Sequence, residues 1–152
     1  SWQLEGNRMA VVFAAVARQR AVGRTIMVFL DYRAAVYAFA EMILASGENV
    51  VLMTGSLAED KKRAAEIATR LGVADVQGFV GRHTVESRET LKLRARRCAR
   101  TAAERRPGEL PLLMIVSKTA SVGLDIVEVS SAVVVSSCDG APLPRLGSRR
   151  VQ

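Results

Sequence analysis

Four short and almost uninterrupted apolar runs are the feature that most constrains the fold of this chain. They lie at 25–30 (TIMVFL), 50–53 (VVLM), 112–116 (LLMIV) and 132–136 (AVVVS). Strands of this kind are buried on both faces, as in a parallel sheet, whereas a half-exposed strand alternates apolar and polar residues. The first run is bounded by Gly23 and Asp31, and the second is closed by Thr54. We therefore predict four buried strands.

Helix-forming segments alternate with these runs. Apolar residues recur at helical spacing in the first two segments, and the third is rich in lysine and glutamate. The three helices are predicted at 4–20, 33–46 and 58–71. Strands that alternate with helices predict an α/β fold with a mainly parallel sheet and helices on both faces.

The stretch between the third helix and the third apolar run has a less regular pattern. Residues 76–80 (VQGFV) are a possible strand, weakened by Gly78. Residues 84–106 are predicted as a helix with Thr84 as its N-cap, so that Ser87 is not needed for the cap. A narrow apolar stripe places this helix on the surface of the fold. The stripe consists of Leu91, Ala95, Cys98 and Ala102.

Length and composition limit the class of protein. The chain has 152 residues, 49% of them hydrophobic, which suits one domain with a core and excludes general disorder. No apolar run approaches the ~20 residues of a membrane helix, so we expect no membrane span. The sequence starts without a methionine and has no secretory signal, and we expect it to be part of a longer polypeptide.

Cysteine and histidine usage argues against a metal site. Cys98 and Cys138 are far apart in the sequence and form no CxxC pair, and His83 is the only further candidate ligand of this kind. We expect a reducing compartment, hence an intracellular and preferably cytoplasmic location. No serine or cysteine nucleophile motif accompanies His83, which is expected to be a surface histidine.

The positive charge is concentrated in one segment. The net charge of the chain is +7, and residues 82–106 contain nine basic side chains against three acidic ones. Such a concentration favours polyanions through counterion release. The alternative, a solvated helix face, is about equally consistent with charge alone.

Small polar residues follow two of the predicted strands. They are Thr54-Gly55-Ser56 and Ser117-Lys118-Thr119. Strand ends of this composition expose backbone N–H groups and hydroxyls, which suit contact with a phosphate backbone irrespective of base sequence. Further on, Gly123 allows a close turn and Asp125 offers a carboxylate to a ribose hydroxyl or an arginine. The alternative is structural: Ser117 and Thr119 cap the next helix, and Asp125 caps a turn.

Three segments resemble motifs of superfamily 2 helicases. Residues 115–126 (IVSKTASVGLDI) align without a gap with motif V, of which VATDVAARGLDI is a typical form. Residues 28–33 (VFLDYR) are similar to motif IV. Residues 53–57 (MTGSL), followed by Lys62, are similar to motif IVa, with Thr54 in place of its histidine. The resemblance covers roughly 22–72 and 110–137.

The resemblance implies that residues 1–152 form the second RecA-like lobe of an ATP-dependent helicase, with a divergent basic helical insertion at about 73–109. It implies nucleic-acid contacts by Arg33, Thr54, Gly55, Ser56, Lys62, Ser117, Lys118 and Thr119. It implies nucleotide contacts by Gly123, Asp125 and Gln152. The implied partners are single-stranded or duplex nucleic acid, with RNA favoured, and the N-terminal lobe of the same polypeptide. ATP and Mg²⁺ would be bound mainly by that first lobe.

The sequence departs from the family pattern in several places. Lys118 stands where many members have aspartate, and Val122 replaces a common arginine or glutamate. Residues 144–149 imitate motif VI poorly, and we favour 147–152 as the approach to that motif, with Gln152 as its first residue. The chain has neither G-x-x-x-x-G-K-[ST] nor D-E-x-[DH], so we name no catalytic residue and expect no ATP hydrolysis by this chain alone.

Two other classes of protein stay open. One is a degenerate RecA-like domain that serves as a non-catalytic scaffold for nucleic acid or protein. The other, weaker, is a Rossmann-like enzyme for nucleotides or sugar phosphates, which would need the missing G-x-G-x-x-G loop.

Overall fold

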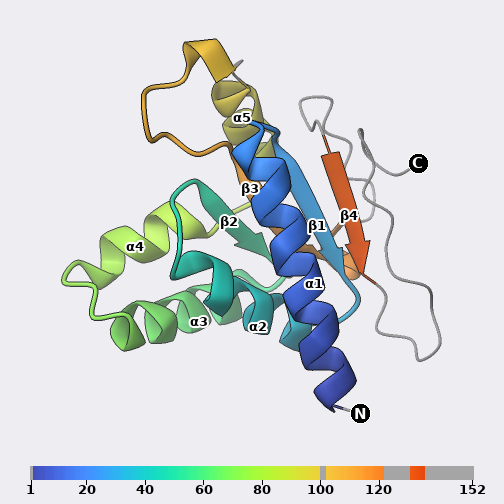
Figure 1. Ribbon diagram of the computed structural model, residues 1–152. Coiled ribbons are helices and arrows are strands. Elements are labelled where there is room, and N and C mark those ends of the chain that lie inside the picture. Colours follow the sequence, from blue (N-terminus) through green and yellow to red (C-terminus); the bar gives the residue numbers. More distant parts are fainter. Residues whose placement is uncertain (1, 100–101, 122–130, 136–152) are drawn as a thin grey trace.

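The computed structural model describes residues 2–99, 102–121 and 131–135, which form helices around a small sheet (Figure 1). The helices are α1 (Trp2–Ala21), α2 (Arg33–Leu44), α3 (Leu57–Arg70), α4 (Val76–His83), α5 (Arg88–Cys98), the 3₁₀ turn Ala102–Glu104 and α6 (Lys118–Ser121). The strands are β1 (Ile26–Leu30), β2 (Val50–Met53), β3 (Leu113–Ser117) and β4 (Ser131–Val135). The four strands and first three helices predicted from sequence are confirmed, with small differences at their ends.

The strands form one parallel sheet in the order β2-β3-β1-β4. In this order β3 lies between β2 and β1, although it follows both in the sequence. Leu30 at the end of β1 is paired with Ser117 at the end of β3, and Met53 of β2 is paired with Val116. The carboxyl ends of these three strands therefore meet at one edge of the sheet.

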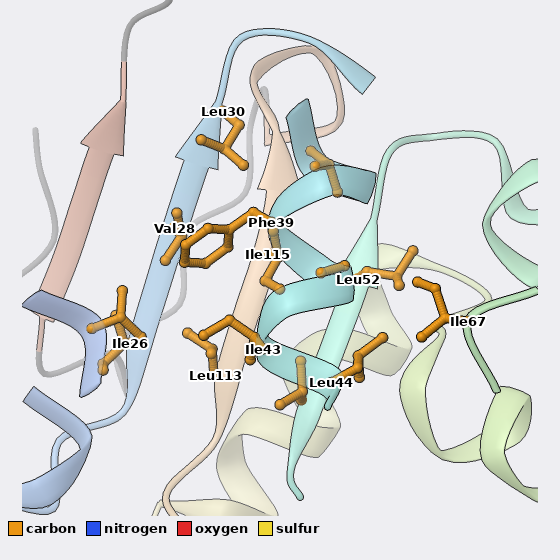
Figure 2. Close-up of a cluster of buried hydrophobic side chains, with 14 of the residues drawn as sticks. Ile26, Val28, Leu30, Phe39, Ile43, Leu44, Leu52, Ile67, Leu113 and Ile115 are labelled. Atoms are coloured by element: carbon orange, nitrogen blue, oxygen red, sulfur yellow. The ribbon is translucent and has the colours of Figure 1, made fainter. Parts of the chain in front are cut away.

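Alternate residues of the strands point to opposite faces, and both faces are covered. On the first face Val28, Leu52 and Ile115 pack against α1, α2 and α3, and Figure 2 shows Phe39 of α2 among them. On the second face Met27, Val51 and Met114 belong to another cluster, which includes side chains of α5 and α6. The prediction of an α/β fold with a parallel sheet and helices on both faces is confirmed.

The strand considered at 76–80 is wrong, because these residues form the start of α4. The carboxylate of Asp75 accepts a hydrogen bond from the Gly78 N–H (3.0 Å) and caps the helix. Phe79 is buried in the first cluster, and Val76 packs against it from one helical turn earlier. The helix cap and this spacing outweigh the local strand pattern.

The helix predicted at 84–106 is shorter at both ends. Ser87 is its N-cap, with the Ser87 hydroxyl accepting from the Thr90 N–H (3.1 Å), and α5 ends at Cys98. Thr84 instead ends α4 and forms a parallel bridge with Leu52 beside β2. The apolar stripe was predicted correctly where it is described: Leu91 and Ala95 are buried against the second face of the sheet, and Cys98 packs beside them. Helix α5, which lies in the expected insertion at 73–109, thus covers the second face of the sheet.

Candidate functional site at the carboxyl edge of the sheet

The carboxyl edge of the sheet has the geometry at which open α/β sheets bind ligands. The helix after β1 is α2, which packs on the first face, whereas α6 follows β3 and contributes Ala120 to the second face. The chain therefore leaves two neighbouring strands toward opposite faces, and a crevice outside the carboxyl ends of such strands is the usual ligand position.

An ion pair spans this position. The Lys118 ammonium lies 2.9 Å from Asp31 Oδ1, and the side chains are 53% and 12% exposed respectively. Asp31 directly follows β1 and Lys118 directly follows β3. Because Asp31 is largely covered, the cation beside it compensates a carboxylate that has lost most of its water. A phosphate at this edge would compete with Asp31 for Lys118.

The Ser117 hydroxyl is buried and already hydrogen-bonded within the fold. It donates to the Thr54 carbonyl (3.1 Å) and accepts from the Ala120 N–H (3.2 Å). One side chain thus joins the end of β3 to the end of β2 and also caps the start of α6. The expectation that this hydroxyl is open to solvent is wrong, and the structural alternative weighed for Ser117 describes its hydrogen bonds.

Thr54 is also buried and belongs to a network around a buried carboxylate. Asp60 in the first turn of α3 accepts from the Thr54 N–H (3.0 Å) and from the Thr54 hydroxyl (2.6 Å). The Tyr37 hydroxyl of α2 donates to the same carboxylate (2.7 Å). These bonds fasten the end of β2 to α2 and α3. The Thr54 hydroxyl is likewise not open to solvent, contrary to expectation.

Tyr37 and Asp60 were missed in the sequence analysis. Burial raises the pKa of Tyr37 to about 12, and the Asp60 carboxylate adds to this rise. A hydrogen bond between the hydroxyls of Tyr37 and Thr54 (3.3 Å) opposes it. Tyr37 therefore remains a hydrogen-bond donor at neutral pH. The sequence did contain a signal for Asp60. It has helical spacing with Ala64 and Ile67, so it shares their buried face of α3, and a buried carboxylate requires hydrogen-bond donors.

The remaining predicted site residues are more open. Gly55 is exposed and has a φ of +93°, a conformation that suits glycine, and a Cβ there would lie 3.7 Å from the Cβ of Ala120. Ser56 is the N-cap residue of α3, although its side chain makes no capping hydrogen bond. Arg33 at the start of α2 and Lys62 on α3 are exposed. Open glycine backbone thus lies at the edge, and two exposed cations lie on the helices that follow β1 and β2.

For four predicted site residues the structure does not describe the position of the side chain. Thr119 belongs to α6, but its side chain is not among the described ones. Gly123, Asp125 and Gln152, the predicted nucleotide contacts, lie outside the described residues.

Within the described ranges, no group of three or more histidine, cysteine, aspartate or glutamate side chains could hold a metal ion. None of the helices described is both long and apolar enough to cross a membrane. Comparison of the chain with protein-family models, with curated proteins and with solved structures finds no significant match. The class that the structure defines is an α/β domain with a small parallel sheet.

Proposed function

We propose that this chain is the second RecA-like lobe of an ATP-dependent helicase or translocase of superfamily 2, which contacts a nucleic-acid backbone and forms one side of the ATP cleft. One observation carries the proposal. The segments that resemble motifs IV, IVa and V are far apart in the sequence, yet each includes the carboxyl end of a strand (β1, β2 and β3 respectively), and these three ends meet at one edge. Nothing in the apolar patterns alone requires that adjacency.

In this proposal the exposed groups of the edge contact phosphate and the buried groups hold them in place. Backbone at Gly55 and the Lys118 ammonium supply a donor surface and a charge that carry no base preference. The Thr54 and Ser117 hydroxyls are positioning groups, since their hydrogen bonds fix the loops after β2 and β3. RNA is the favoured substrate.

ATP and Mg²⁺ would be held mainly by a first lobe of the same polypeptide, which would supply the triphosphate-binding chemistry. Closure of the two lobes around ATP would move their phosphate-contacting loops relative to each other. The strand bound at the edge of this lobe would then be displaced stepwise.

A non-catalytic scaffold is the second candidate, and a specific observation favours it. The hydroxyls of Thr54 and Ser117 and the ammonium of Lys118 all have partners inside the domain. A degenerate lobe would keep these bonds for stability alone.

Binding of a fluorescent single-stranded RNA, measured by anisotropy between ~50 and ~200 mM salt, tests the proposed edge. Lys118→Gln should weaken binding and lower the slope of log affinity against log salt by about one. Lys61→Gln is the matched control, because Lys61 is exposed on α3 outside the predicted contacts. Equal losses in the two variants, or binding that is insensitive to salt, would contradict the proposed edge.

A further inference from the structure

The only histidine of the chain is buried at the amino edge of the sheet, opposite the candidate site. His83 is 4% exposed, so its expected surface position is wrong. Its Nδ1 lies 2.7 Å from the Val50 carbonyl oxygen. Since a carbonyl only accepts, Nδ1 carries the proton and Nε2 is left as the acceptor nitrogen.

A cavity of about 80 Å³ adjoins His83. Its polar lining comes from three parts of the chain: Arg82 and His83 at the end of α4, Arg94 of α5, and Glu48 and Asn49 just before β2. We call this space the amino-edge cavity. About 10–15 Å³ of such space holds one water molecule, so the cavity has room for several waters or for a small oxyanion.

Among the described residues, no counter-charge contacts either of the two arginines that line the cavity. Neither the Arg82 nor the Arg94 guanidinium forms a hydrogen bond or ion pair with another described side chain. Arg94 is half-buried, and burial lowers its pKa; Cys98 opposes this shift, and the charge of Arg97 adds to it. A half-buried cation without an anion is costly, and a bound anion would remove that cost.

A third guanidinium adds to the positive potential here. Arg20 of α1 is buried and donates to the backbone carbonyls of Glu48 and Pro111, and burial lowers its pKa to about 10. No carboxylate is in contact with it among the described residues. Arg20 thus places a cation on the backbone of Glu48, a residue of the cavity lining.

The cavity has a neighbouring opening. A larger hollow of about 540 Å³, lined by Arg106 and by the turn around Gly108, shares Glu48 and Asn49 with it.

We propose that the amino-edge cavity binds a phosphate monoester or inorganic phosphate, held by the guanidinium groups of Arg82 and Arg94. Arginine suits this ligand because its planar donor fork matches phosphate oxygens. The Glu48 carboxylate, also in the lining, opposes the anion and limits the affinity. This inference does not depend on the proposed function, since the site lies at the other edge of the sheet.

Calorimetric titration of the chain with sodium phosphate, with sodium chloride at equal ionic strength as reference, tests the site. Arg94→Gln should weaken phosphate binding about tenfold or more, and Arg82→Gln should weaken it as well. Glu48→Gln should strengthen it. Arg88→Gln is the matched control: Arg88 is exposed at the start of α5, away from the cavity lining.

Opposite effects of Arg94→Gln and Glu48→Gln, with no effect of Arg88→Gln, would support the site. Equal losses in the Arg88 and Arg94 variants would overturn it, as would a response to phosphate no larger than that to chloride. Arg82 is exposed, so its variant keeps the test valid if Arg94→Gln does not fold.

A second titration identifies the source of the phosphate group, with oligonucleotides that carry either a 5′-phosphate or a 5′-hydroxyl. A preference for the phosphorylated strand that is lost in Arg94→Gln supports a strand end as ligand. Equal binding of the two strands, with saturable binding of inorganic phosphate, supports free phosphate.

Discussion

The ammonium group of Lys118 lies 2.9 Å from a carboxylate oxygen of Asp31, so an ion pair joins the carboxyl ends of β3 and β1. If these residues border a phosphate-binding edge, Asp31 competes with the ligand for the same cation. The Asp31→Asn variant should then bind single-stranded RNA about twofold to fivefold more tightly, since pairs of this exposure contribute modestly. Anisotropy at constant salt measures the change.

Glu66→Gln is the control for that variant, because it also removes one negative charge, from the half-exposed side of α3. A gain of the same size in both variants would mean that net charge alone is responsible. No gain in Asp31→Asn would place the RNA elsewhere.

Asp60→Ala should destabilise the domain strongly. The substitution leaves the Thr54 N–H and the hydroxyls of Thr54 and Tyr37 without their acceptor in a buried site. We expect the free energy of unfolding to fall by about 3 kcal/mol or more, measured by urea denaturation. The neighbouring Glu59→Ala should change it by less than about 0.5 kcal/mol, because the Glu59–Arg63 pair is at the surface.

Ser117→Ala should affect stability rather than RNA affinity. The lost hydroxyl bonds the Thr54 carbonyl and the Ala120 N–H, so the free energy of unfolding should fall by about 1–2 kcal/mol. The folded variant should still bind RNA, since the hydroxyl positions the loops after β2 and β3 and does not itself contact the ligand. Ser56→Ala is the control for stability, since the Ser56 side chain makes no capping bond. A loss of RNA affinity in the fully folded Ser117 variant as large as that of Lys118→Gln would contradict a purely positioning role of the hydroxyl.

His83 should make the domain less stable in acid. Burial lowers its pKa below 6.5, and the charges of Arg82 and Arg94 contribute, while the bond to Val50 and the charge of Glu48 oppose the shift. The unfolded chain therefore binds the proton more readily, so stability is complete above about pH 6.5 and falls as the pH decreases below it. Urea denaturation at several pH values should show this slope, and His83→Asn should reduce it. An unchanged slope in that variant would assign the acid sensitivity to other groups.

The chain alone should not release phosphate from ATP, with or without RNA, because it contains neither a P-loop sequence nor an acidic D-E-x-[DH] motif. A phosphate-release assay with excess RNA tests this expectation. Stimulated hydrolysis above the level of a heat-denatured sample would contradict the assignment of ATP chemistry to another lobe.

Sequence patterns predicted the elements well where a long or strongly apolar segment determined the result. The four strands followed from their continuous apolar runs. The α4 helix was not predicted, because a five-residue segment that contains Gly78 suits a strand as well as a helix. The hydrogen bond from the Gly78 N–H to the Asp75 carboxylate caps the helix and favours it over a strand. Thr84 and Ser87 are both good N-caps, and only the bridge between Thr84 and Leu52 shows why the helix starts after Ser87.

The candidate site was predictable only in part. That polar residues follow the strands was evident, but the contact between Asp31 and Lys118 depends on β3 lying next to β1, which local patterns do not encode. The partners of Thr54 were hidden for the same reason. Tyr37 and Asp60 lie on two different helices that converge only when both pack on the first face of the sheet.

The cover of β2 by the end of α4 has a further consequence. In the described sheet β2 is a terminal strand, and its four apolar residues are buried. The end of α4 covers this strand: His83 hydrogen-bonds the Val50 carbonyl, and Thr84 forms a bridge with Leu52. Uncovered strand edges of this composition pair readily with other chains. Detachment of α4 alone would therefore make the domain prone to aggregation before the rest of it unfolds. Light scattering of a His83→Ala variant at temperatures below its melting transition would detect that process.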